Sequence, residues 1–302
     1  MVYQEITSNK IKTVVLMGFM LILIIGLGWV FSLYLDAPGL LPIAVVFSIG
    51  MSLFSYYFSD KVVLGISGAK EIKRSDDEEL YRTVENLSIA AGLPTPKIYL
   101  IQDSAMNAFS TGRDPKHAVV AITTGLRSQL DKPELEGVMA HELSHIGNYD
   151  IRLMTIIVVL VGVVTLLADW MMRISFYGGR RKSNNDNNGA NGVFIIVALV
   201  MAILSPIAAT IMQLAISRKR EYLADASAAL LTRYPKGLVS ALEKLARDTE
   251  PLEVANKATA HMYIVNPLKD QDKKNSVSWF AGLFLTHPPI QDRINKLNQM
   301  NV

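Results

Sequence analysis

Two long apolar segments near the start of the chain, separated by only four residues, constrain its fold more than any other feature. Residues 14–35 contain no charged side chain, and residues 40–58 form a second apolar run of similar length. A helix needs roughly 20 apolar residues to cross the hydrocarbon core of a bilayer, which is about 30 Å thick. Because the connection is so short, the two segments predict an antiparallel transmembrane hairpin.

Two further apolar segments, residues 153–171 and 193–216, predict a second hairpin and about four spans in all. Half of the residues are hydrophobic, which is high for a soluble enzyme of this length. The alternative for the second pair is burial in a protein core, and the sequence leaves this open. The loop between them, residues 178–191, has no large apolar side chain and predicts disorder.

Basic residues orient the first hairpin. Lys10 and Lys12 precede it, four more basic side chains follow it within residues 61–74, and its turn has none. Because cytoplasmic loops carry the excess of Lys and Arg, we expect the N-terminus and the chain after residue 58 to face the cytoplasm. Simple alternation would place the Arg-rich second loop outside, against the same rule, so the second pair is not oriented by its charges.

The composition argues against a nucleic-acid-binding site and excludes cysteine as a metal ligand. The net charge is only +3 and no basic stripe carries interleaved aromatic residues, so nucleic acid is not an expected partner. The chain has no Cys, so any metal ion must be bound by His, Asp or Glu.

The remaining segments have the composition of a soluble domain with helices and short strands. Helices are predicted at residues 76–91, 217–231, 235–247 and 288–300, and strands at 97–101 and 118–122. We expect a first transmembrane hairpin at residues 1–59. A soluble α+β domain follows in two parts, residues 60–150 and 217–302, and a second hydrophobic hairpin at residues 151–216 separates these parts. The two soluble parts must meet in space.

His141, Glu142 and His145 belong to the sequence HELSH on a helix that Asp131 is expected to cap. Residues four apart lie on one helical face, so both imidazoles can bind the same ion. Glu142 can accept a proton from the water that attacks a peptide carbonyl, while zinc polarises that carbonyl. The alternative is two histidines on an ordinary surface helix.

A catalytic zinc ion needs a third protein ligand and one open position. Glu221 is the best candidate, and Asp225, four residues later on the same helix, could orient a ligating histidine. The residues alone leave open that both belong to a solvated charge cluster. His287 precedes a helix that contains Arg293, and either side chain could stabilise an oxyanion, although His287 could also cap that helix.

Five motifs in a fixed order carry a resemblance to a known family. They are MNAFSTG at 106–112, ITTGL at 122–126, HELSHIGNYD at 141–150, SRKREYLAD at 217–225 and THPPIQDRI at 286–294. On these motifs the chain resembles the HtpX family of bacterial inner-membrane heat-shock metalloproteases over nearly its whole length. It resembles the prenyl-protein CaaX proteases more distantly.

The resemblance implies a membrane α-helical protein with about four transmembrane helices and an α+β, gluzincin-like zinc metalloprotease domain. One zinc ion per chain would be bound by His141, His145 and Glu221, with Glu142 as general base. Asp225 would orient a ligating histidine without binding the zinc ion itself.

The resemblance also implies roles for residues around the zinc site. His287 and Arg293 would line the cleft near the transition state. Extended polypeptide substrates would add as a strand to an exposed edge. The residues expected to form this edge are Asn107, Ala108, Phe109, Val119 and Ala121.

The leading hypothesis is an endopeptidase that cuts misfolded or damaged membrane proteins, in quality control and stress response, at the cytoplasmic face of a bacterial inner membrane. Seven residues separate His145 from the third apolar segment, so the zinc ion should lie near the membrane surface. The alternatives are a narrow CaaX-type processing protease, a non-catalytic membrane scaffold with a structural zinc ion, and a transporter marked by Asp169. Neither the oligomeric state nor the cleavage preference is indicated.

Overall fold

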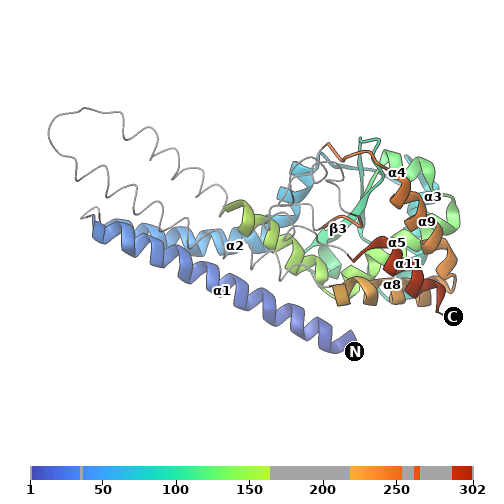
Figure 1. Cartoon of the computed structure of the whole chain (residues 1–302). Helices are drawn as coiled ribbons and strands as arrows, with labels where there is room; N and C mark the ends of the chain where they lie inside the picture. Colours follow the sequence, from blue (N-terminus) through green and yellow to red (C-terminus); the bar gives the residue numbers. More distant parts are fainter. Residues whose placement is uncertain (1, 35–36, 164–217, 254–261, 266–287, 301–302) are drawn as a thin grey trace.

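The computed structural model describes residues 2–34, 37–163, 218–253, 262–265 and 288–300. Two long helices, α1 (Val2–Tyr34) and α2 (Leu40–Ile66), form an antiparallel hairpin that projects from a body of helices and strands (Figure 1). Both helices are long and apolar enough to cross a membrane, so the first predicted hairpin is present. The second helix continues to Ile66, beyond the predicted end at residue 58.

The outward surface of this hairpin suits lipid better than water. Val14, Ile22 and Val46 are exposed by 70, 69 and 72 % respectively. Small residues on α2, such as Ser48 and Ser55, are buried, and a Cβ on Gly28 would lie only 2.2 Å from the Cβ of Ala44, whereas α1 also buries Met20. Small residues that allow a close helix contact, with large apolar residues facing outward, are the arrangement expected of helices packed in a bilayer.

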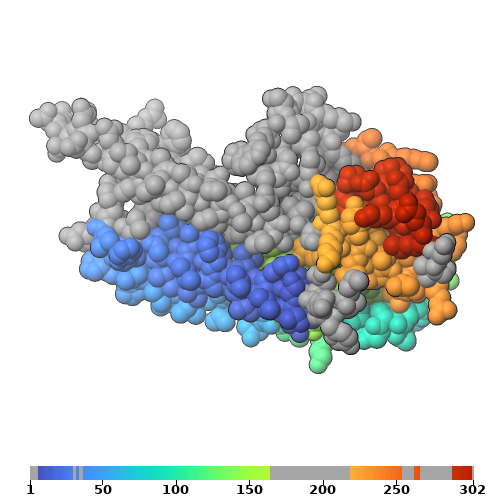
Figure 2. All heavy atoms as spheres, turned by 60° about the horizontal axis from the view of Figure 1, so that its bottom comes forward, coloured from blue at the N-terminus to red at the C-terminus, as the bar shows by residue number. Residues whose placement is uncertain are grey.

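α1 is longer than a membrane span requires. Its 33 residues correspond to about 50 Å at 1.5 Å per residue, whereas the hydrocarbon core is about 30 Å thick. In Figure 2 the dark-blue part of α1 lies against the body, and Asn9 and Thr13 on this part are buried. α1 thus extends from the hairpin to the body.

The third predicted apolar segment is described only in part. It begins as a helix, Asp150–Val163, which follows α5 (Lys132–Gly147) after an 80° bend and is almost entirely buried. Among the described residues two helices qualify as spans, or three if this bent pair is counted as one. The predicted fourth span, the loop 178–191 and Asp169 lie outside the described residues, so the number of spans stays a prediction.

The body is built on a four-stranded sheet in the order β1-β2-β4-β3. Its strands are β1 (Lys70–Glu71), β2 (Lys97–Ile101), β3 (Ala108–Gly112) and β4 (Ala118–Thr123). β2 and β4 are parallel, and the two outer strands pair antiparallel with them. β3 is therefore an edge strand.

The position of β4 corrects one prediction. β4 lies between β2 and β3, and its residues are all buried. Val119 and Ala121, which were expected at an exposed edge, pair with strands on both sides. Their backbone groups are not available to an added strand, so the predicted edge position was wrong for these two residues, and their contact with substrate stays a prediction.

Helix α5 lies at the centre of the body and carries the HELSH sequence. The other helices around the sheet are α3 (Glu78–Ala91), α4 (Thr124–Gln129), α8 (Arg218–Thr232), α9 (Pro235–Arg247) and α11 (Ile290–Asn298), and a 3₁₀ turn lies at Pro115–His117. The predicted helices and strands are present, with ends that differ by a few residues. α5 packs against α3, α8, α9 and β3, which enclose it on several sides.

Local sequence explains both the start of α5 and its close packing. Asp131 caps the helix by accepting from the backbone N–H of Glu134, whose side chain in turn accepts from the N–H of Asp131. A Cβ on Gly137 would lie 2.7 Å from the backbone nitrogen of Leu238, so glycine is needed where α5 meets α9. These features fix the helix that presents the histidines.

Candidate active site

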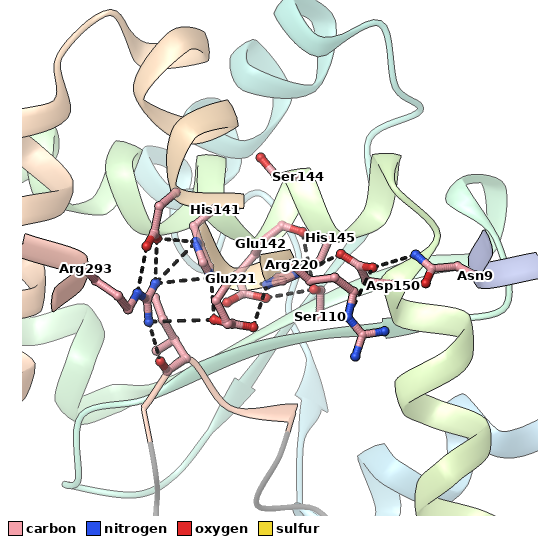
Figure 3. Close-up of polar contacts among 12 residues, drawn as sticks. Asn9, Ser110, His141, Glu142, Ser144, His145, Asp150, Arg220, Glu221 and Arg293 are labelled. Atoms are coloured by element: carbon pink, nitrogen blue, oxygen red, sulfur yellow. Dashed lines mark hydrogen bonds and ion pairs between the residues drawn. The ribbon is translucent and has the colours of Figure 1, made fainter. Parts of the chain in front are cut away.

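His141 and His145 lie on the same face of α5, and Glu221 faces them from α8 (Figure 3). The Nε2 atoms of the two histidines are 3.2 Å apart. One carboxylate oxygen of Glu221 is 3.7 Å from Nε2 of His141, and the other is 3.7 Å from Nε2 of His145. All three side chains are buried, so the two parts of the soluble sequence do meet at this point.

The geometry of this group fits a tetrahedral metal ion. Two imidazole nitrogens, each bound to zinc at about 2.0–2.1 Å, would be about 3.3 Å apart in a tetrahedral site, and the observed separation is 3.2 Å. The three residues offer ligand atoms within 4.8 Å of one another. Among the described residues the group has three members, which leaves one position of a tetrahedral site for water or substrate.

Asp225 holds His141 from the side opposite the cluster, and Arg293 holds Asp225. Oδ1 of Asp225 is 3.0 Å from Nδ1 of His141. Nε and Nη2 of Arg293 donate to the two oxygens of Asp225 at 2.9 and 2.7 Å. Burial would raise the pKa of Asp225, but the charge of Arg293 and the hydrogen bonds from His141 and Arg293 lower it to about 2. The ionised carboxylate therefore keeps a proton on Nδ1 and directs the lone pair of Nε2 towards the cluster.

Asp150 holds His145 in the same way. α5 ends at Gly147, and Tyr149 adopts a left-handed backbone conformation with φ 59°. This turn brings Oδ2 of Asp150 to 2.9 Å from Nδ1 of His145. The other oxygen, Oδ1, accepts a hydrogen bond of 2.7 Å from Nδ2 of Asn9, which belongs to α1 (Figure 3).

The electrostatic field at His145 favours a cation. Burial would lower the pKa of its imidazole, but the hydrogen bond to Asp150 and the negative charges of Glu221 and Glu142 raise the pKa to about 9. A set of carboxylates that attracts a proton this strongly also attracts a divalent metal ion. The donor types and the field thus both suit a metal.

Glu142 is held in place by β3. Ser110 Oγ donates to Oε2 of Glu142 at 2.7 Å, and the carboxylate is almost fully buried. Because Glu142 lies beside His141 on α5 without belonging to the three-residue cluster, its carboxylate is near the metal site and oriented by a neutral donor.

The edge of β3 is partly covered by the chain itself. The N–H of Ile264 donates to the carbonyl of Ala108 at 3.0 Å, and Nδ2 of Asn107 donates to the carbonyl of Val265 at 3.1 Å. The ring of Tyr263 packs edge-on against Phe109. Residues 262–265 thus lie along the first part of the edge where substrate was expected, and strand addition at Asn107, Ala108 and Phe109 stays a prediction.

Arg293 lies beside the metal-ligand cluster. Its side chain is fully buried, and its guanidinium contacts Asp225, His141 and the carbonyl of Ile264, while its Nη1 is 3.8 Å from Oε2 of Glu221. This position supports two of the expected ligands, and a contact of Arg293 with the transition state stays a prediction. His287, the other predicted transition-state residue, lies outside the described residues.

Four further residues at the site were not identified from the sequence: Asn9, Ser110, Asp150, and Arg220, whose Nε is 3.9 Å from Oδ1 of Asp150. Asp150 follows His145 by five residues and closes the HELSHIGNYD motif, so the motif itself was a usable signal. Ser110 lies inside the MNAFSTG motif, but nothing there indicates a partner on α5. Asn9 contacts Asp150 across 141 positions, which no local pattern reveals.

Comparison with known proteins agrees with this site. Residues 74–301 match peptidase family M48. Relatives named "Protease HtpX homolog" from Dictyoglomus thermophilum and Tropheryma whipplei are 46% and 43% identical over 99% of this chain, covering 94% and 99% of those proteins. The crystal structure of S. mikatae Ste24p has a TM-score of 0.50 at 20% identity, covering 98% of this chain and 67% of that one, and this likeness shows the fold alone.

The predicted resemblance is confirmed by these matches. They extend over the soluble body and, in the relatives, over the apolar hairpin as well. The chain therefore belongs to peptidase family M48 and is a membrane metalloprotease.

Proposed function

We propose that the chain is a zinc-dependent endopeptidase that binds one zinc ion through His141, His145 and Glu221. The observation that carries this proposal is the buried cluster itself, with ligand atoms within 4.8 Å of one another and the spacing of a tetrahedral site. The carboxylate of Glu142 lies next to this cluster and is oriented by Ser110. A three-ligand site with a separate carboxylate beside it is what a hydrolase needs, whereas a structural zinc site prefers four protein ligands and does not need this carboxylate.

Zinc, when bound, supplies Lewis-acid chemistry, because it acidifies water and polarises the carbonyl of the scissile peptide. Glu142 accepts the proton of the attacking water on a carboxylate oxygen and passes it to the nitrogen of the leaving amine. Asp225 and Asp150 keep the Nδ1 protons of the two histidines in place. Arg293 acts as a positioning residue through Asp225, and His287 stays a proposed contact of the transition state.

The substrates we propose are membrane proteins with exposed or misfolded segments close to the bilayer. The metal site lies beside the point where α1 reaches the body, so membrane-proximal polypeptide is the substrate nearest to it. An extended peptide would pair with β3 at and beyond Ser110, because residues 262–265 lie along the earlier part of the edge. A role in quality control under stress follows from the family resemblance.

The orientation that we propose places the body in the cytoplasm of a bacterium, at the inner membrane. The support is the basic residues at the open end of the hairpin, with Lys10 and Lys12 before the apolar run 14–35 and Lys61 after the run 40–58, together with a turn at residues 36–39 that has no Lys or Arg.

The test is proteolysis of casein by the purified full chain in detergent. Wild type should cut with added Zn²⁺ and stop with a chelator. Glu142→Gln should lower the rate by about 10²–10⁴-fold, because the general base is lost, while metal content stays at about one ion per chain. His117→Ala, at an exposed histidine away from the cluster, is the matched control and should cut like wild type.

The opposite result separates the alternatives. If wild type binds zinc but cuts no unfolded substrate, and Glu142→Gln behaves identically, general endopeptidase activity is excluded. A narrow processing protease of the CaaX type or a non-catalytic scaffold would then be the better description. If wild type binds no metal, the site itself has been misassigned.

A further inference from the structure

The turn between α5 and the following helix is held by α1 through several contacts. Nδ2 of Asn9 donates to Oδ1 of Asp150 at 2.7 Å and to the backbone carbonyl of Asn148 at 3.0 Å. The ammonium group of Lys10 lies 4.5 Å from the centre of the Tyr149 ring. One end of α1 therefore contacts both residues of this turn, Asn148 and Tyr149, and also Asp150 at the start of the next helix.

These contacts stabilise an unfavourable backbone conformation in the turn. Tyr149 has φ 59°, a left-handed conformation that costs free energy for a residue with a Cβ. The turn also fixes Asp150, whose second oxygen is bonded to Nδ1 of His145. Asn9 is 1 % exposed, so water does not compete for its donor group. A shift of Asn9 would change the direction of the Asp150 carboxylate, and with it the imidazole.

We propose that Asn9 is a positioning residue of the metal centre, through which the seating of the N-terminal membrane helix sets how tightly His145 binds metal. The inference rests on the proposed metal site. Asn9 acts through Asp150 and touches neither metal nor substrate. Removing an outer partner of a metal ligand typically costs about 10–100-fold in metal affinity, and Asn9 stands one step further out.

The experiment measures Zn²⁺ affinity of the full chain in detergent by competition with a fluorescent chelator. Every variant carries Glu142→Gln so that the chain cannot cut itself. Asn9→Ala should lower the affinity about tenfold. Asn9→Asp should lower it further, because the carboxylate that it introduces faces Asp150 across a 2.7 Å contact. The visible absorption spectrum of the Co²⁺-loaded chain should also shift in Asn9→Ala, since it reports ligand geometry.

Thr13→Val is the matched control. Thr13 is buried one turn along α1, and its Oγ1 donates to the carbonyl of Asn9 within the helix. This variant should bind Zn²⁺ within about twofold of its parent and keep the Co²⁺ spectrum. An equal loss in Thr13→Val would mean that general loosening of α1 explains the effect, and would overturn the inference.

A double-mutant cycle decides whether Asn9 acts through Asp150. In an Asp150→Asn background, Asn9→Ala should have little further effect on Zn²⁺ affinity. A full additive loss in that background would overturn the inference, as would an unchanged affinity of Asn9→Ala alone. If the parent chain binds no Zn²⁺, the proposed function fails together with this inference. If the parent binds Zn²⁺ and Asn9→Ala binds it equally well, only this inference fails.

Discussion

His141 and His145 lie one turn apart on the same helix, yet different regions of the molecule hold them. His141 is held by Asp225 of α8, which is bound by Arg293 of α11, and all of these residues belong to the body. His145 is held by Asp150, whose other oxygen takes its hydrogen bond from α1 of the hairpin. Two histidines with the same chemistry thus depend on separate regions.

The difference lies in how the buried carboxylate is compensated. Asp225 has a cation bonded to both oxygens, which lowers its pKa to about 2 and keeps it charged within the body alone. Asp150 has a more distant cation, because Nε of Arg220 on α8 lies 3.9 Å from its Oδ1, and the short hydrogen bond to that oxygen comes from a neutral amide on α1. We expect the Asp225 side to contribute to the stability of the body, and the Asp150 side to depend on how α1 is seated.

The largest effect is expected on the body side, from Arg293→Met. This change keeps an apolar stem but leaves the buried carboxylate of Asp225 without its cation. Breaking a buried ion pair typically costs about 3–5 kcal/mol. Thermal unfolding of the full chain in detergent should therefore shift to a much lower midpoint, together with loss of bound metal.

Arg293→Lys is the control for that experiment, since it keeps the charge and loses the two-pronged hydrogen bond. It should lie between wild type and Arg293→Met in unfolding midpoint. A midpoint of Arg293→Met close to wild type would show that the two sides of the site do not differ in the way we describe.

A smaller effect is expected on the membrane side, from Asp150→Asn. The amide keeps the size of the side chain but no longer stabilises the Nδ1 proton of His145 with a charge. Zn²⁺ affinity should fall by about 10–100-fold, with a much smaller change in unfolding midpoint than for Arg293→Met. Equilibrium competition with a chelator measures the affinity. A large loss of stability with unchanged affinity would reverse the comparison.

The body side was also the easier side to predict from the sequence. The capped helix with His141 and His145 follows from local spacing, because a helix places residues four apart on one face. Glu221 and Asp225 share one helix by the same rule, but their approach to α5 needed the family resemblance. The same resemblance assigned Val119 and Ala121 to an edge, and it failed because strand order is set by pairing between distant segments.

The membrane side could not have been predicted in this way. Asn9 is one of several polar residues at the start of α1, and its contact with Asp150 depends on where the whole hairpin packs. The sequence predicted the hairpin from the length of its apolar runs alone, and this length does not determine which residue the side-chain amide of Asn9 will contact. The bend at Tyr149 is equally hidden, because a left-handed residue other than glycine has no reliable local signal.

A still smaller effect is expected at Ser110, which belongs to neither side. Ser110→Ala removes the 2.7 Å hydrogen bond to Glu142 and leaves both histidine supports intact. A hydrogen bond to a charged group contributes about 1.5–3 kcal/mol, so kcat for casein cleavage should fall about tenfold or more. Metal content should not change. Ser110→Thr, which retains the hydroxyl, is the control, and a fall in metal content in Ser110→Ala would assign Ser110 to the metal site itself.

The smallest effect is expected at Asp77, far from the metal site. A change at Asp77 shows how much stability is lost when one charge pair is removed without any effect on metal binding. Asp77 caps α3 and accepts hydrogen bonds from Arg127. Burial raises the pKa of Asp77, but Arg127 and the backbone N–H of Leu80 outweigh it, so the folded pKa is lower than usual. Its charge thus stabilises the fold above about pH 4, and this contribution is lost as the pH falls through the lower folded value.

Asp77→Asn keeps the cap, since Asn is also a good N-terminal cap, and removes the charge from a partly exposed pair. At neutral pH the variant should be less stable by under about 1 kcal/mol, and the difference should shrink towards zero in acid. Unfolding midpoints of the two proteins across that pH range measure it. If the deficit persisted in acid, the charge would not be its cause, and Asp77 could not serve as the reference against which the losses at Arg293 and Asp150 are compared.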